Sequence, residues 1–332
     1  MKILVIRFSS AGDILLTSLF LRALRRRFPQ AQIDFLTKKQ FEELVQHSPH
    51  INQSIAFPSP SKFADLIKLR GELRETRYDL VFDLHNSLRS RIVRFRLGSR
   101  RLVFRKPTFK KWLLVRFKVN LLRPITPIPE RYLDVGKSYS LENDGKGLEF
   151  FPGKTDFTLP LDLPKPLIAL APGARHFTKR WPAKEYAKLG ATLLEERGGT
   201  LLLLGGDDEV DIGKEVEAAI GDGKSVLNLV GTTTLSEVAK VVERCSILVA
   251  NDSLLSHVAA AVGTPVITIF GSTVEEFGFA PYGAAATILQ RSDLDCRPCT
   301  TVGRSECPRK HFHCMNLIQV SDIGGAIAEK LD

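Results

Sequence analysis

The first half of the chain alternates short apolar runs with longer amphipathic stretches. The segments at 2–8, 32–36 and 79–84 are short and rich in branched aliphatic or aromatic residues, a pattern typical of buried strands. Between the first two, the pattern predicts a helix that follows the turn at 9–13 and ends near Arg27. Parallel strands need such crossover helices, so this half predicts a parallel sheet.

The same alternation restarts after a proline-rich segment. Leu159–Pro166 holds three prolines in eight residues and predicts a linker. Strands are then expected at 167–171 and 200–204, with a helix at 183–197 between them, and the series continues to Phe270. Two successive series of this kind predict two Rossmann-like parallel-sheet domains facing each other across a cleft.

Length and composition agree with two α/β domains. A chain of 332 residues with 44% hydrophobic residues is large enough for two cores, expected at 1–160 and 167–332. The apolar run at 2–6 is too short for a signal peptide, and five cysteines fit reduced thiols better than a disulfide scaffold. We therefore expect a cytoplasmic protein.

Polar groups gather at the end of an apolar run that begins at Ile247. Asp252 and Ser253 follow this run, and His257 lies one helical turn further on. Ligands of open parallel sheets bind at the carboxyl ends of the strands, so these three residues predict a ligand site. Two alternatives stay open. Asp252 alone serves as a helix N-cap, or the uncharged residues 253–274 span a membrane despite the break at Pro265.

A second candidate site lies at 171–182. Small residues and cations precede a helix whose start is marked by Pro182, an arrangement that suits phosphate binding. The segment has neither the Walker pattern nor GxGxxG, so neither an ATPase nor a nicotinamide enzyme is indicated. The acidic residues of Gly205–Glu209 follow the next strand. At that position they either accept hydrogen bonds from ribose hydroxyls or cap the following helix.

Positive charge is concentrated in one segment. Residues 85–129 contain no Asp or Glu, and 89–123 carries thirteen Lys and Arg residues against a net charge of +10 for the whole chain. Aromatic residues are interleaved with these cations. Such a segment attracts anionic lipid or nucleic acid, whereas the alternative is a solvated basic helix whose aromatic stripe faces the core.

Three segments, taken together in their order, resemble the heptosyltransferases of lipopolysaccharide core synthesis, and the resemblance covers essentially the whole chain. These enzymes are inverting GT-B glycosyltransferases that use ADP-heptose. The segments are RFSSAGDILLTSLFLRALRRRFP near the N-terminus, KRWP at Lys179–Pro182, and NDSLLSHVAAAVGTPVITIFGST from Asn251. One departure is Leu254, which stands where the family has a glycine. Its side chain hinders a diphosphate from coming close to the backbone at this position.

The resemblance implies roles for single residues. Asp13 is the catalytic base, although a helix N-cap remains the alternative, and Lys179 stabilises the leaving diphosphate without a metal. The residues implied in substrate binding are Ser10, Gly12, Thr178, Thr233, Asp252, Ser253 and His257. The N-terminal domain then binds the acceptor and the C-terminal domain the nucleotide-sugar donor.

The resemblance also implies the partners. ADP-heptose is the donor substrate and no cofactor is expected, while the acceptor is a lipid-linked anionic saccharide of the Kdo-lipid A type. We expect a monomer that lies peripherally on the inner face of the inner membrane, held there by 89–123. Nucleic acid is not the expected partner. The alternatives are another nucleotide sugar or acceptor, or a nucleic-acid-binding protein on a relic of a nucleotide fold.

Four cysteines near the C-terminus have partial metal-ligand character. Cys296, Cys299, Cys307 and Cys314 are spaced x2, x7 and x6, with two histidines between the last two. A structural metal, reduced buried thiols and a reversible disulfide are all open. Because the segment follows the last expected strand, we expect no part for it in the chemistry.

Overall fold

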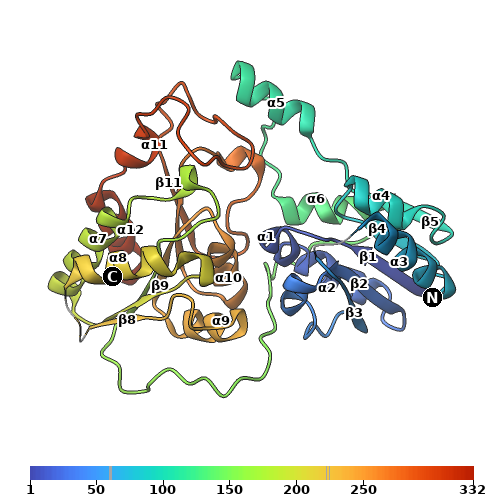
Figure 1. Ribbon diagram of the computed structural model, residues 1–332, viewed down its shortest axis with the longest axis horizontal. Coiled ribbons are helices and arrows are strands. Elements are labelled where there is room, and N and C mark those ends of the chain that lie inside the picture. Colours follow the sequence, from blue (N-terminus) through green and yellow to red (C-terminus); the bar gives the residue numbers. More distant parts are fainter. Residues whose placement is uncertain (60–61, 222, 224) are drawn as a thin grey trace. The chain divides into compact units, whose positions relative to one another are not determined.

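A computed structural model describes residues 1–59, 62–221, 223 and 225–332. The chain forms two compact units (Figure 1). Met1–Pro107 and Ile128–Gly153 make up the first, and Thr108–Pro127 and Lys154–Asp332 make up the second. Compared with the expected ranges 1–160 and 167–332, the short segment at 108–127 groups with the second unit although it precedes the linker.

The first unit is a five-stranded parallel sheet in the order β3-β2-β1-β4-β5. One core cluster is built from strand residues such as Leu4 and Ile6 and helix residues such as Leu66 and Leu69. Its elements are β1 (Lys2–Ile6), α1 (Ala11–Leu15), α2 (Ser18–Arg27), β2 (Gln32–Lys38), β3 (Gln53–Phe57), α3 (Phe63–Glu75), β4 (Leu80–Asp83), α4 (Leu88–Arg94), β5 (Arg100–Val103) and α6 (Ile128–Val135), with a 3-10 turn at Lys39–Leu44.

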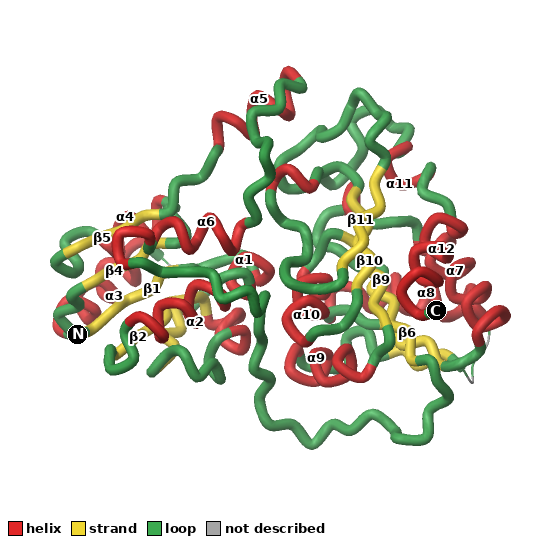
Figure 2. The backbone as a smooth tube through the Cα atoms, turned by 180° about the vertical axis from the view of Figure 1, so that it is seen from behind, coloured by secondary structure: helices red, strands yellow, loops and turns green. Residues whose placement is uncertain are grey.

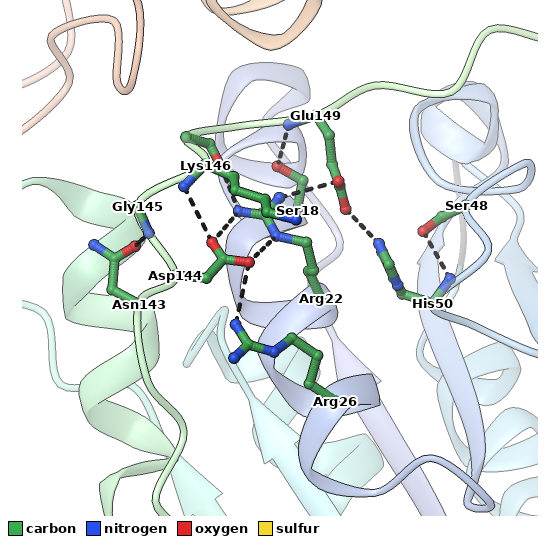
Figure 3. A network of polar contacts seen from close by, with 11 residues as sticks. Ser18, Arg22, Arg26, Ser48, His50, Asn143, Asp144, Gly145, Lys146 and Glu149 are labelled. Carbon is green, nitrogen blue, oxygen red and sulfur yellow. Dashed lines mark hydrogen bonds and ion pairs between the residues drawn. The ribbon is translucent and has the colours of Figure 1, made fainter.

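A polar network ties α2 to the last segment of the first unit (Figure 3). The buried Arg22 guanidinium donates to both carboxylate oxygens of Asp144, at 2.8 and 2.9 Å, and pairs with Glu149 at 3.0 Å. His50 Nε2 lies 2.5 Å from the other oxygen of Glu149. The hydrogen bonds from Arg22 hold the pKa of Asp144 well below its ordinary value. The network explains why residues after α6 belong to this unit.

The second unit is a six-stranded parallel sheet in the order β11-β10-β9-β6-β7-β8. Hydrophobic clusters cover both faces of this sheet. Successive residues of one strand, such as Ile168 and Ala169, point to opposite faces and belong to different clusters. Its elements are α5 (Thr108–Phe117), β6 (Leu167–Ala171), α7 (Ala183–Arg197), β7 (Thr200–Leu203), α8 (Val210–Ile220), β8 (Val226–Asn228), α9 (Leu235–Arg244), β9 (Ile247–Asn251), α10 (Leu254–Val262), β10 (Val266–Phe270), β11 (Ala286–Gln290), α11 (His313–Asn316) and α12 (Val320–Leu331).

These two sheets confirm the predicted α/β class with two parallel sheets, and Figure 2 shows helices against the strands in each unit. The membrane-span alternative for 253–274 is wrong, because α10 ends there at Gly263, whose φ of +82° closes the helix, and β10 follows. Within the described residues, no helix has both the length and the apolar composition needed to cross a bilayer.

Candidate active site

Each sheet reverses its strand order at one place, and candidate residues lie at both. In the first sheet the reversal is between β1 and β4, and Asp13 follows β1. In the second it is between β6 and β9, and Lys179 follows β6 while Asp252 follows β9. Ligands of open α/β sheets bind beyond the strand ends at such reversals, so the topology points to both places independently of any motif.

Lys179 and Asp252 form a largely buried ion pair. Lys179 Nζ lies 2.7 Å from Asp252 Oδ2, and the two side chains are 16% and 8% exposed. The Thr273 hydroxyl donates to the same carboxylate oxygen at 2.7 Å. The N-cap of α10 is Ser253 rather than Asp252, so Asp252 is positioned by its pairing and not by a capping role. An ammonium held in this way is available to an anion that displaces the carboxylate.

The loop that carries Lys179 is fixed on two sides. Asn251, at the end of β9, accepts a hydrogen bond from Trp181 N at 2.9 Å and donates to Pro172 O at 2.9 Å. On the other side, Thr178 Oγ1 accepts from Arg304 N at 2.8 Å. The Thr178 hydroxyl is therefore already engaged within the loop. The sequence pattern had assigned no role to Asn251, although a buried amide at the end of an apolar strand was a signal for one.

The electrostatic field of this loop favours an anion. Burial and the neighbouring charges of Arg175, Lys179 and Arg180 lower the pKa of His176 below its ordinary value. The same cations that disfavour a positive imidazole stabilise a negative ligand by the same Coulomb interaction. The loop after β6 therefore combines a fixed backbone with a concentration of positive charge, and phosphate binding there stays a prediction.

The other residues expected near the donor follow different strands of the second sheet and have different surroundings. Ser253 begins α10, and His257 is buried within that helix. Thr233 lies just before α9, where its hydroxyl donates to Leu229 O at 3.2 Å. Among the acids after β7, Glu209 accepts from Gly206 N at 3.0 Å, as in the capping alternative, and burial raises its pKa.

Asp13 has four polar contacts in the first unit. Its Oδ1 lies 2.7 Å from Arg7 Nη2 and accepts from the Tyr132 hydroxyl at 3.4 Å. Its Oδ2 accepts from the hydroxyl and the backbone N–H of Ser10, at 2.6 and 3.2 Å. Ser10 is the N-cap of α1, so Asp13 is not the N-cap itself but supports the cap from the first turn, which also contains Gly12.

The surroundings of Asp13 keep it ionised. Burial alone would raise its pKa, but the Arg7 charge and the hydrogen bonds from Ser10 outweigh burial and lower the pKa. Arg7 is itself buried and donates to Leu84 O, which fixes the guanidinium beneath the carboxylate. Nearby, burial and the charges of Arg7 and Lys106 lower the pKa of His85 to about 3. The sequence pattern gave no sign that Arg7, Tyr132 and His85 surround Asp13.

The basic segment does not form one surface element. Residues 89–107 belong to the first unit and 108–123 to the second. The alternative of an aromatic stripe facing the core is wrong for Phe95, Phe109, Trp112 and Phe117, which are all exposed, while Phe104 is buried.

The four C-terminal cysteines have free thiols in the second unit, where Cys314 is buried and the other three are partly exposed. Burial raises the pKa of Cys314 to about 12. In the part of the chain that the structure describes, no group of three or more His, Cys, Asp or Glu side chains is arranged to hold a metal ion.

A family model described as glycosyltransferase family 9 (heptosyltransferase) matches residues 66–310. The chain belongs to this family. Lipopolysaccharide heptosyltransferase 2 of Escherichia coli K12 is 30% identical to this family 9 enzyme over 295 residues, which cover 83% of this chain and 84% of the relative. The sequence resemblance to heptosyltransferases is thereby confirmed, and the chain is a glycosyltransferase.

One solved structure agrees with this assignment, and a second, more distant one shows the same fold. The ADP-heptose lipopolysaccharide heptosyltransferase II of E. coli is 25% identical, with a TM-score of 0.70 over 97% of this chain and all of the other. A family 9 glycosyl transferase of Veillonella parvula superposes with a TM-score of 0.77 at 20% identity, over 99% of this chain and 97% of that one. The matched range 66–310 includes Lys179 and Asp252 but not Asp13.

Proposed function

We propose that this family 9 glycosyltransferase transfers heptose from ADP-heptose to a lipopolysaccharide core acceptor of the Kdo-lipid A type, with inversion at the anomeric carbon. The observation that carries the proposal is the Lys179–Asp252 pair at the strand reversal of the second sheet. The names of the E. coli relatives support heptose as the transferred sugar and ADP as its carrier.

The second unit binds the donor in this proposal. Lys179 exchanges its partner Asp252 for the diphosphate and stabilises the charge that grows on ADP as the glycosidic bond breaks. Asp252, Ser253 and His257 hold the diphosphate or the sugars, while Thr178 and Thr233 line the nucleotide side. No metal is needed, because the cations of the loop supply the positive charge.

The first unit binds the acceptor, and Asp13 is the base. An acceptor hydroxyl donates its proton to the Asp13 carboxylate as its oxygen bonds to the anomeric carbon, and the bond from that carbon to the diphosphate oxygen breaks. The Arg7 ion pair supports this role because it keeps the carboxylate ionised. The Ser10 hydroxyl, now on Asp13 Oδ2, yields its position to the acceptor hydroxyl, with Gly12 in the same turn.

The enzyme works as a monomer at the inner face of the inner membrane, where a lipid-linked acceptor is anchored. The thirteen cations of 89–123 support this placement, since each basic residue that reaches an anionic surface contributes about 1 kcal/mol.

Calorimetric titration of the purified protein with ADP, GDP, UDP and ADP-heptose tests the donor. We expect binding of ADP and ADP-heptose, weakened in Lys179→Ala. The absence of binding for every nucleotide diphosphate would contradict the enzymatic proposal. A donor screen by mass spectrometry then separates heptose from other sugars. Leu254, which replaces the family glycine, favours the second candidate function, transfer from another nucleotide sugar.

Asp13→Asn tests the base. We expect turnover to fall by roughly 10²–10⁴-fold with ADP affinity nearly unchanged, because a general base acts on the acceptor and not on the donor. Loss of ADP binding in this variant would place Asp13 on the donor instead.

A further inference from the structure

Helix α5 exposes three aromatic rings that contact one another. Phe109, Trp112 and Phe117 are 67%, 49% and 55% exposed. The Phe109 and Trp112 rings are stacked with centroids 5.9 Å apart, and the Phe117 ring meets Trp112 edge-on at 5.3 Å. Contiguous aromatic surface of this kind is uncommon on a protein that stays in water and marks a site of interaction. In Figures 1 and 2, α5 stands out from the six-stranded sheet of its unit.

The opposite side of α5 and the residues after it are firmly held. Leu114 and Leu122 form a small core with Val274 and Phe277. Lys118 Nζ donates to Pro298 O at 2.7 Å and to Cys296 O at 3.2 Å, which ties the end of the helix to the cysteine segment. The exposed rings are therefore presented by an anchored helix, and their exposure does not result from a loose segment.

Aliphatic side chains extend the aromatic surface. Val119 and Leu121, which follow the helix, are 46% and 47% exposed. Single-stranded nucleic acid uses ring faces and cations, but it gains nothing from exposed aliphatic groups. A bilayer boundary accommodates both kinds of side chain, with aromatic rings at the headgroup level.

The charge around α5 selects an anionic surface. Lys110, Lys111 and Arg116 lie on the helix, and the chain contains no Asp or Glu from 85 to 129. Lys111 lies over the rings of Phe277 and Phe279, at 4.9 and 5.0 Å, so part of this charge also holds the helix in place. The combination of exposed rings, aliphatic side chains and cations matches the composition of helices that insert into anionic membrane surfaces.

We propose that α5 inserts Phe109, Trp112 and Phe117 into the boundary layer of an anionic lipid bilayer, and that it is the apolar anchor of this enzyme. The inference deepens the proposed function, since a lipid-linked acceptor requires a membrane contact. It narrows that contact from the whole basic segment to one helix of the second unit.

Tryptophan fluorescence of the full chain provides the test, because the protein has two tryptophans and only one is accessible. Trp181 is fully buried, whereas Trp112 is half exposed. On vesicles of phosphatidylcholine and phosphatidylglycerol we expect a blue shift, and quenching by lipids brominated near the headgroup. Trp112→Phe should abolish both signals while vesicle sedimentation persists.

The variant Phe109→Ser/Phe117→Ser tests the energetic contribution of the rings. We expect at least about a tenfold loss of vesicle affinity, since two large apolar side chains no longer leave water. The matched control is Phe63→Ser on α3, because Phe63 is 66% exposed but lies in the first unit, and it should keep wild-type affinity.

Three results would overturn the inference. The first is binding to anionic vesicles without any change in Trp112 emission, which would leave charge alone as the cause. The second is equal vesicle affinity in the double variant and the wild type, and the third is a Trp112 signal that appears only with single-stranded oligonucleotides. ADP titration of the same samples keeps the two proposals separate, because a protein that inserts but binds no nucleotide contradicts the function and not the anchor.

Discussion

Replacing Lys179 by Met should destabilise the second unit and weaken ADP binding together. The substitution removes the cation from the Asp252 side chain, which is 8% exposed, and leaves the hydrogen bond that the Thr273 hydroxyl donates to its Oδ2 at 2.7 Å. Breaking a buried ion pair from one side costs ~3–5 kcal/mol, and a charged hydrogen bond to a ligand contributes ~1.5–3 kcal/mol. We expect a loss of about 3 kcal/mol in unfolding free energy, or ~6–12 °C in the melting temperature for a unit of this size.

Differential scanning calorimetry measures the first quantity and titration with ADP the second. ADP affinity should fall by ten- to a hundredfold, at ~1.4 kcal/mol per factor of ten. Lys184→Met is the matched control, because Lys184 is 75% exposed and pairs with Glu185 at 3.8 Å, so its melting temperature should hardly change.

Asp252→Asn completes the comparison. It leaves the Lys179 ammonium in place, so its effect on ADP affinity should be smaller than that of Lys179→Met. The double variant Lys179→Met/Asp252→Asn should be more stable than Lys179→Met alone, because it no longer contains an unpaired buried carboxylate. A melting temperature of Lys179→Met equal to that of Lys184→Met, or weaker ADP binding in Asp252→Asn than in Lys179→Met, would contradict this role of the ion pair.

Three further predictions concern groups with a defined environment. Arg22→Met should destabilise the first unit by about 3 kcal/mol in urea unfolding, because Asp144 and Glu149 lose the buried charge between them; no loss would contradict the network. NMR should show no protonation of His85 in the folded protein from pH 8 to 5. Below the ordinary histidine pKa of 6.5 only the unfolded state takes up this proton, so the free energy of unfolding should fall as the pH is lowered towards 3. Cys245 and Cys314, with pKa values of about 12, should react with thiol reagents at pH 8 roughly 10³-fold more slowly than an ordinary thiol.

The fold was predictable because buried parallel strands read as continuous apolar runs. The strand at 167–171 and the helix at 183–197 were predicted to the residue. The strand pattern gave Lys179 and Asp252 as parts of two separate candidate sites, and only the family resemblance implied that both act on the diphosphate. Their ion pair fits the topology, since parallel strands bring their carboxyl ends to one edge.

What local pattern could not provide is the identity of distant partners. An arginine at the end of an apolar strand gives no sign that its partner is Asp13, and Tyr132 reaches Asp13 from 119 residues away. Likewise, hydropathy does not reveal which core Leu114 joins, because Val274 and Phe277 lie far along the chain. The unit to which α5 belongs therefore depends on tertiary packing.

The position of α5 limits how this enzyme can be dissected. The chain passes from one unit to the other after Pro107, after Pro127 and after Gly153. A fragment that begins at the linker lacks Leu114 and Leu122, and it exposes Val274 and Phe277 to water. An uninterrupted stretch of the gene that contains every residue of one unit therefore also carries a segment of the other, because 1–153 includes 108–127 and 108–332 includes 128–153. A recombinant second unit without first-unit residues needs 108–127 joined to 154–332 through an artificial connection, and a protease that cuts near 127 leaves neither unit complete.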